Sequence, residues 1–168
     1  MNNLVISNSI RFIILILVQV LVLDNVHFLG YITPYIYILF ILLFPLNANR
    51  SVLLIASFLL GFSVDIFEGS GGIHAAACVC MAYTRSFALK SSFGVSYEYN
   101  VIKINEIPFG RRITYVGLLV FIHHTVLYVL EFFNFDHILL LLKTTLFSIL
   151  FSSILIMISM VLFSRKSA

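Results

Sequence analysis

An all-α integral membrane protein of six transmembrane helices is the fold that this sequence predicts, and three observations lead to it. The 168 residues are 61% hydrophobic and only 10% charged, whereas an average soluble domain is about 25% charged. The apolar residues fall into six segments, most of them close to the length of about 20 residues that a spanning helix needs. The basic residues lie almost entirely on one side of the layout that these segments define. We therefore expect one transmembrane domain over residues 1–168.

The expected spans follow the apolar segments in chain order. The first begins near Arg11 and shows no small-residue cleavage pattern at its end, so we expect a retained helix rather than a cleaved signal. The second contains Pro34 and Pro45, and the stretch between them is short, so this helix either begins irregularly upstream or fails to cross fully. The spans are expected at residues 9–28, 29–46, 51–67, 72–89, 113–133 and 138–163, with a cytoplasmic loop at 90–112.

The charged residues predict the orientation of these spans. Nine of the ten Lys and Arg residues fall on one side of the layout, and Lys143 alone falls on the other. Five of the seven Asp and Glu residues fall on the side of Lys143. Because basic residues stay on the cytoplasmic side, we expect a multi-pass protein of the inner membrane with both termini in the cytoplasm. The net charge of +3 is then a topology signal, and we expect no nucleic-acid partner.

The stretch from Gly61 to Arg85 organises this layout, because it joins two apolar halves through a Gly-Ser-Gly-Gly turn. As a helical hairpin it brings Asp65, Glu68 and His74 to one membrane face. Arg85 follows His74 by 11 residues, or about 17 Å of helix, so it marks the opposite face. Asp65 is then either part of a docking spot or pocket at the outer face, or a carboxylate that simply solvates the turn.

The second half of the hairpin carries a polar stripe. His74, Cys78, Met81 and Arg85 fall within about 40° of one another at about 100° per residue. Cys78 and Cys80 point to different sides of the helix, and we interpret them as packing residues, because free Cys behaves as a small hydrophobe. Small residues that let helices approach closely run beside this stripe, namely Ala75, Ala76, Ala77 and Ala82.

The fifth expected span has two adjacent histidines at its centre, His123 and His124. Ionisable groups at the bilayer midplane are costly and usually face the bundle interior. His124 shares one side of the helix with Gly117, Tyr128 and Glu131, which predicts a polar track toward the outer surface. The track is either a proton path or ligand pocket, or a set of neutral imidazoles bonded to neighbouring helices. Adjacent histidines point about 100° apart, so we expect no shared metal.

The sixth expected span carries hydroxyl side chains at helical spacing. Their spacing of three, four and seven residues predicts a small polar seam for helix packing. The residues of this seam are Thr145, Ser148, Ser152 and Ser159.

The hairpin resembles the signature of MreD, the family of rod shape-determining membrane proteins. The resemblance extends over essentially the whole chain in length, number of spans and hairpin position, but the hairpin is its specific part. The residues that carry it are Gly61, Asp65, Gly71, Gly72, Ile73, His74, Ala75, Ala82, Tyr83 and Arg85, with Gly94–Tyr99 and Phe109–Arg112 in the following loop.

This resemblance implies a non-enzymatic scaffold of the peptidoglycan elongation machinery that maintains rod cell shape. It implies an MreC-like partner, with MreB, RodA and a penicillin-binding transpeptidase in the wider complex, and a fold like the substrate-binding S-component of vitamin ECF transporters. Asp65, Gly72, His74, Tyr83 and Arg85 are the positions that the resemblance marks. With the polar face of the fifth span, the candidates for partner or pocket contacts are Asp65, Gly72, His74, Tyr83, Arg85, His124, Tyr128 and Glu131.

Two other functions remain open from the sequence. A small-molecule- or lipid-binding transporter subunit would share the implied fold, but it would need a small-residue face on the first span, where residues 12–18 are bulky. An intramembrane enzyme would rest only on His123, His124 and Glu131. The chain contains no nucleotide-binding loop, nucleophile elbow, zinc-protease motif or paired catalytic carboxylates. We therefore expect no enzyme activity, no cofactor and no metal, and membrane lipids as the surroundings.

Overall fold

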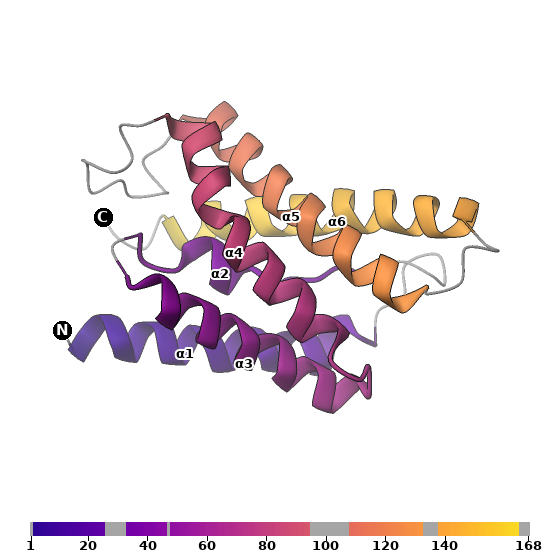
Figure 1. Cartoon of the computed structure of the whole chain (residues 1–168). Coiled ribbons are helices and arrows are strands. Elements are labelled where there is room, and N and C mark those ends of the chain that lie inside the picture. Colours follow the sequence, from indigo (N-terminus) through magenta and orange to yellow (C-terminus); the bar gives the residue numbers. More distant parts are fainter. Residues whose placement is uncertain (1, 26–32, 47, 95–107, 133–137, 165–168) are drawn as a thin grey trace.

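The computed structural model describes residues 2–25, 33–46, 48–94, 108–132 and 138–164, and every regular element among them is a helix (Figure 1). The all-α prediction is therefore confirmed for these residues. In chain order the elements are α1 (Asn2–Val18), the π-helical turn η1 (Gln19–Leu23), α2 (Leu39–Leu43), α3 (Arg50–Glu68), α4 (Ile73–Phe93), α5 (Phe109–Glu131) and α6 (Ile138–Ser164).

Four helical stretches are long and apolar enough to cross a membrane, which indicates an integral membrane protein as the composition predicts. They are Val5–Leu23, Arg50–Glu68, Phe109–Glu131 and Ile138–Leu162. The helix α4 has 21 residues and is therefore long enough to span, but it is less apolar than these four. The described residues thus contain four helices that meet both criteria for a membrane span, whereas the sequence predicts six spans.

The second expected span, residues 29–46, contains no long helix among the residues that the structure describes, which agrees with the alternative of a short or irregular helix in this segment. Its only α-helix is α2, which has five residues. Phe44 has φ −59° and ψ 141°, the extended conformation that the following Pro45 favours. Residues 34–42 are all buried, so their apolar character reflects a place inside the bundle rather than contact with lipid. Residues 26–32 lie outside the described part.

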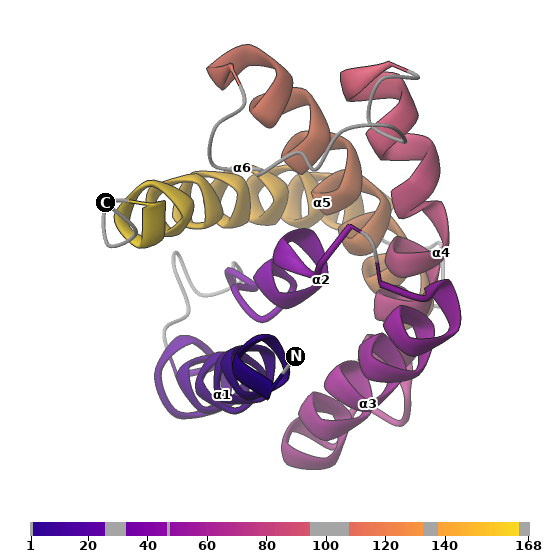
Figure 2. The same cartoon turned by 90° about the vertical axis from the view of Figure 1, so that its left-hand side faces the viewer.

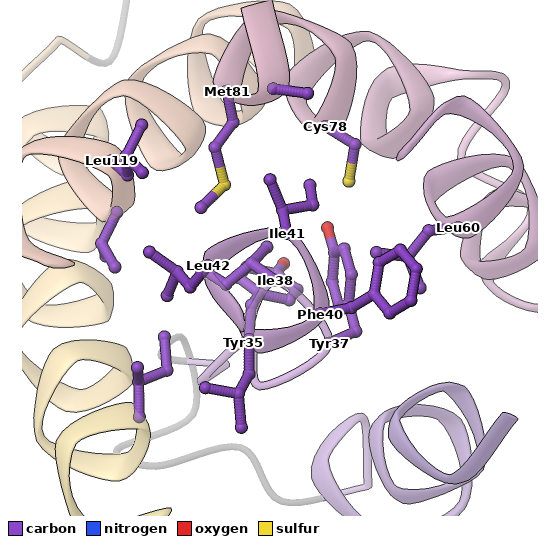
Figure 3. Packing of buried hydrophobic residues seen from close by; sticks show 14 of the residues in the cluster. Tyr35, Tyr37, Ile38, Phe40, Ile41, Leu42, Leu60, Cys78, Met81 and Leu119 are labelled. Atoms are coloured by element: carbon purple, nitrogen blue, oxygen red, sulfur yellow. The ribbon is translucent and has the colours of Figure 1, made fainter. Parts of the chain in front are cut away.

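The segment around α2 occupies the centre of the bundle. Figure 2 shows α2 with α1, α3, α4, α5 and α6 arranged around it. The helix α4 contacts both α3 and α5, and α6 contacts α5. Figure 3 shows the side chains of Ile38, Ile41 and Leu42 between those of surrounding helices, among them Met81 of α4 and Leu119 of α5.

Gly61 sets the closest approach between α3 and α4. A Cβ atom at this position would lie 2.4 Å from the backbone oxygen of His74 and 2.6 Å from the backbone of Ala75. Both contacts are with backbone, which cannot rotate away. The absence of a side chain at Gly61 therefore lets the two helices meet near the hairpin.

The long loop expected at 90–112 is shorter than predicted at both ends. The helix α4 continues to Phe93, and α5 begins at Phe109, directly after Pro108. Arg111 and Arg112 therefore belong to a helix rather than to the loop. Residues 95–107, which include most of the loop named in the family resemblance, lie outside the described part.

Candidate functional site

The hairpin between α3 and α4 is built on glycines in the left-handed conformation. Gly69 ends α3 with φ 68°, and Gly72 precedes α4 with φ 100°. Residues with a Cβ atom rarely adopt these angles, whereas glycine does so at little cost. The structure therefore gives Gly72 a conformational role at the start of α4.

Asp65 lies inside the hairpin and caps α4 from the neighbouring helix. Its carboxylate accepts hydrogen bonds from the Ser70 hydroxyl at 2.5 Å and from the backbone N–H groups of His74 and Ala75 at 3.0 and 2.9 Å. The first N–H groups of a helix have no partner within it, and a carboxylate there also meets the positive end of the helix dipole. Asp65 is 4% exposed, so the interpretation of Asp65 as a solvated turn residue is wrong.

A chain of hydrogen bonds runs from Glu68 at the hairpin into the core. The Nε2 atom of His74 lies 2.7 Å from the Glu68 carboxylate, and its Nδ1 atom lies 2.7 Å from the Tyr37 hydroxyl. The same hydroxyl lies 2.9 Å from Nε2 of His123. These contacts link α3, α4, the segment before α2 and α5 through side chains that are buried except for Glu68.

The positions of the protons in this chain follow from donor counting when both histidines are neutral. His74 donates from Nε2 to Glu68, so its Nδ1 accepts from the Tyr37 hydroxyl. The Tyr37 oxygen then accepts from Nε2 of His123, which leaves Nδ1 of His123 as an acceptor. That Nδ1 atom is buried and has no hydrogen-bond partner among the described residues. The network therefore ends at His123.

His124 belongs to a second set of bonds, which joins α5 to α6. Its Nδ1 atom donates to the backbone oxygen of Val120 at 2.9 Å, and its Nε2 atom accepts from the Ser152 hydroxyl at 3.0 Å. Ser152 in turn accepts from the backbone N–H of Tyr35 at 2.9 Å. His124 is completely buried. The structure therefore matches the alternative of a neutral imidazole bonded to a neighbouring helix.

The polar seam predicted on the sixth span is present where it faces α5. Ser152 contacts His124 as described, and the Ser148 hydroxyl lies 2.7 Å from the Tyr128 hydroxyl. Thr145 instead donates to the backbone of its own helix at Leu141. Tyr128 and His124 therefore share one interface, as their helical spacing predicts.

Arg85 lies in the middle of α4, about three turns after His74, and binds the C-terminal end of α2. Its guanidinium donates to the Tyr115 hydroxyl at 3.0 Å, to the backbone oxygen of Leu42 at 3.5 Å and, in a shorter contact, to that of Phe44. Tyr115 also donates to Leu42 at 3.2 Å. Arg85 is 4% exposed. A cation there satisfies carbonyl groups that the short helix leaves open and meets the negative end of its dipole.

Two candidate residues lie apart from this interior network. Tyr83 is 62% exposed, and the Arg50 guanidinium lies over its ring at 4.5 Å. Arg50 also donates to the Tyr83 backbone oxygen at 3.3 Å. Glu131 is exposed at the last turn of α5. The predicted track along α5 therefore has a buried part, His124 and Tyr128, and an exposed end.

Three important residues were absent from the candidates drawn from the sequence. Tyr37 connects the two histidines His74 and His123, and Tyr115 supports Arg85. Gln19, in the π-helical turn, accepts from the backbone N–H of Ile36 at 2.9 Å and donates to Asp24 at 2.7 Å. A lone Gln within an apolar span was a usable signal, because such residues usually face the bundle interior. The tyrosines carried no comparable signal.

An apolar groove is lined by residues of both α5 and α6. Its volume is about 500 Å³. Ser153 is the one polar residue in its wall, so the groove suits hydrocarbon rather than a polar ligand. The residues that line it are Phe109, Ile113, Ser153, Ile154, Met157, Ile158, Val161 and Leu162.

The described residues contain no cluster of three or more His, Cys, Asp or Glu side chains with the geometry of a metal site. A scan against protein-family models, a search of curated proteins and a search of solved structures each found no match for this chain.

Proposed function

We propose that this chain is a non-enzymatic membrane scaffold of the peptidoglycan elongation machinery, similar to MreD proteins, and that it maintains rod cell shape by binding an MreC-like partner. MreB, RodA and a penicillin-binding transpeptidase belong to the wider complex in this proposal. The chain lies in the inner membrane with both termini in the cytoplasm. The hairpin signature around Asp65, Gly72 and His74 is the sequence support for this assignment.

One structural observation carries the proposal: the centre of the bundle is filled by the chain itself. Tyr37, Ile38 and Ile41 are completely buried there, and the polar groups around them bond mostly to one another. An enzyme or a carrier needs a cavity with polar groups that are free to meet a substrate. Here those polar groups fix the helices to one another, which suits a rigid scaffold whose partners bind from outside.

The groove between α5 and α6 favours a second candidate, a lipid-binding membrane subunit. Its wall is almost entirely apolar, and its position on two candidate spans gives access from the bilayer. This groove does not resemble the interior pocket that a small polar vitamin requires. The fold of a transporter S-component stays part of this second candidate.

Purification in mild detergent tests both functions together. The tagged full-length chain is isolated from rod-shaped cells, and co-purifying proteins and lipids are identified. Recovery of an MreC-like protein, together with rounding of cells that lack the chain, is the expected result. Recovery of a transporter ATPase or a stoichiometric lipid without wall-synthesis partners would contradict the scaffold and favour the second candidate.

Cysteine labelling tests the orientation. In a Cys78→Ala and Cys80→Ala background, Ser70→Cys at the hairpin should react with an impermeant reagent added to intact spheroplasts. Ser91→Cys, an exposed position near the other end of α4, is the matched control and should react only after permeabilisation. The opposite pattern would invert the topology.

A further inference from the structure

The carboxyl group of Asp24 lies in an unusual environment at the end of η1. Its Oδ1 atom accepts a hydrogen bond from Nε2 of Gln19 at 2.7 Å. Its Oδ2 atom is buried and has no hydrogen-bond partner among the described residues. A buried oxygen without a partner costs free energy, so the second oxygen of Asp24 requires an explanation.

Glu68 supplies that explanation, because α3, which ends at Glu68, packs against η1, and the charge and hydrogen bond of Glu68 help to raise the pKa of Asp24. Glu68 is the last residue of α3, and it also contacts Nε2 of His74 at 2.7 Å. Two ionised carboxylates are both acceptors and cannot bond to each other. A single proton between them converts one into a donor and satisfies the buried oxygen.

We propose that Asp24 and Glu68 form a binding site for one proton, and that the shared proton fastens the end of the first helix to the α3–α4 hairpin. Loss of this proton places two negative charges side by side, which repel each other. Asp24 then needs water, and η1 must loosen from the hairpin to admit it. The site therefore makes the packing of the first helix sensitive to the pH at the hairpin face.

The surrounding charges fit this arrangement. His74 of α4 faces Glu68 and partly balances its charge, and Glu131 of α5 adds a further negative charge to the same region. Asp65 of α3 is already bonded to the start of α4. The pKa of Asp24 is raised to about 6: burial raises it most, the charge and the hydrogen bond of Glu68 also raise it, and the hydrogen bond from Gln19 and the charge of His74 oppose the rise.

The sign of the pH effect follows from this pKa. Between the ordinary value of 3.8 and about 6, folded Asp24 holds a proton that the unfolded chain has lost. Stability therefore falls as the pH rises through this range. A pKa shift of this size changes the folding equilibrium constant by at most about 100-fold. The expected change is smaller, because Asp24 is only half-buried and solvent screens its charge.

The first test is the stability of the full-length chain in detergent as a function of pH. We expect the unfolding equilibrium constant to rise several-fold from about pH 4 to about pH 7. Asp24→Asn, which cannot ionise, should abolish most of that rise, whereas the control Glu131→Gln, which removes a carboxylate that does not bond to Asp24, should keep the larger part of it. A flat wild-type profile, or an unchanged profile in Asp24→Asn, would overturn the proposal.

A second test needs no substitution at Asp24 and works even if that variant fails to fold. Infrared spectroscopy with carbon-13-labelled aspartate should detect a protonated aspartic acid near pH 5 that disappears near pH 8. The Glu68→Gln side chain is uncharged, and its NH₂ group can donate a hydrogen bond to Asp24 without binding an extra proton. In this variant the transition should therefore move to lower pH. No protonated aspartate at pH 5, or a transition unaffected by Glu68→Gln, would show that the proton is not shared.

Discussion

Asp65 and Arg85 are buried charged side chains, and each is held by the backbone of a helix terminus. The Asp65 carboxylate binds the N–H groups of His74 and Ala75 at the start of α4. The Arg85 guanidinium, from the middle of α4, binds the carbonyl groups of Leu42 and Phe44 at the end of α2. In both cases the sign of the charge opposes the local end of the helix dipole.

The two sites differ in how far apart along the chain the partners lie. Asp65 and the residues it caps are 9 and 10 positions apart, so one hairpin brings them together. Arg85 and its carbonyl partners are 43 and 41 positions apart, and their contact requires the whole bundle. The Asp65 site is therefore a local structure, whereas the Arg85 site depends on the position of α2.

Replacement of Arg85 should have the largest effect on stability, ahead of replacement of Asp65 or Tyr83. Arg85→Met keeps an apolar stem but leaves the buried carbonyl groups and the Tyr115 hydroxyl with fewer partners. We expect a loss of about 3–5 kcal/mol in the free energy of unfolding, measured by denaturation in mixed micelles.

Arg85→Lys is the matched control for this substitution. It keeps the charge but loses the planar fork that reaches two carbonyl groups and Tyr115 together, so its loss should be smaller. Equal stability of Arg85→Met and wild type would show that α2 does not depend on this cation.

Replacement of Asp65 should have an intermediate effect on stability. The turn glycines and the close approach of α3 and α4 at Gly61 also stabilise the hairpin. Asp65→Asn removes the charge and turns an NH₂ group toward the N–H groups of α4. We expect a loss of about 1–3 kcal/mol in unfolding free energy. Ser70→Ala, which removes one of the three hydrogen bonds to Asp65, should cost less. A larger loss in Ser70→Ala than in Asp65→Asn would contradict the capping role.

Replacement of Tyr83 should have the smallest effect, since its contact with Arg50 lies on the surface. Tyr83→Leu keeps apolar area but removes the ring beneath the guanidinium, and exposed contacts of this kind contribute about 0.5–1 kcal/mol. Unfolding of Tyr83→Leu and Tyr83→Phe should be compared, because Phe retains the ring. If Tyr83→Leu keeps wild-type stability but loses the MreC-like partner, Tyr83 belongs to a docking surface instead.

The sequence by itself determined the features that depend on which residues follow one another within a single segment. Helical periodicity placed His74, Cys78, Met81 and Arg85 on one face of α4, and the structure buries all four. The glycines at 69–72 predicted a tight turn, because they adopt angles that other residues avoid. The ends of α3 and α6 also fall within one residue of the expected spans, since turn-forming or polar residues border these apolar runs.

Only the tertiary structure decided which polar groups bond to one another and whether the second apolar segment lies inside the bundle or faces lipid. Residues 34–42 are as apolar as a span, because burial in a bundle and contact with lipid select the same side chains. Tyr35 and Ser152 are 117 residues apart, and Tyr37 and His123 are 86 apart. No periodicity in one segment can specify such pairs, because they depend on how separate helices pack around the segment that contains α2.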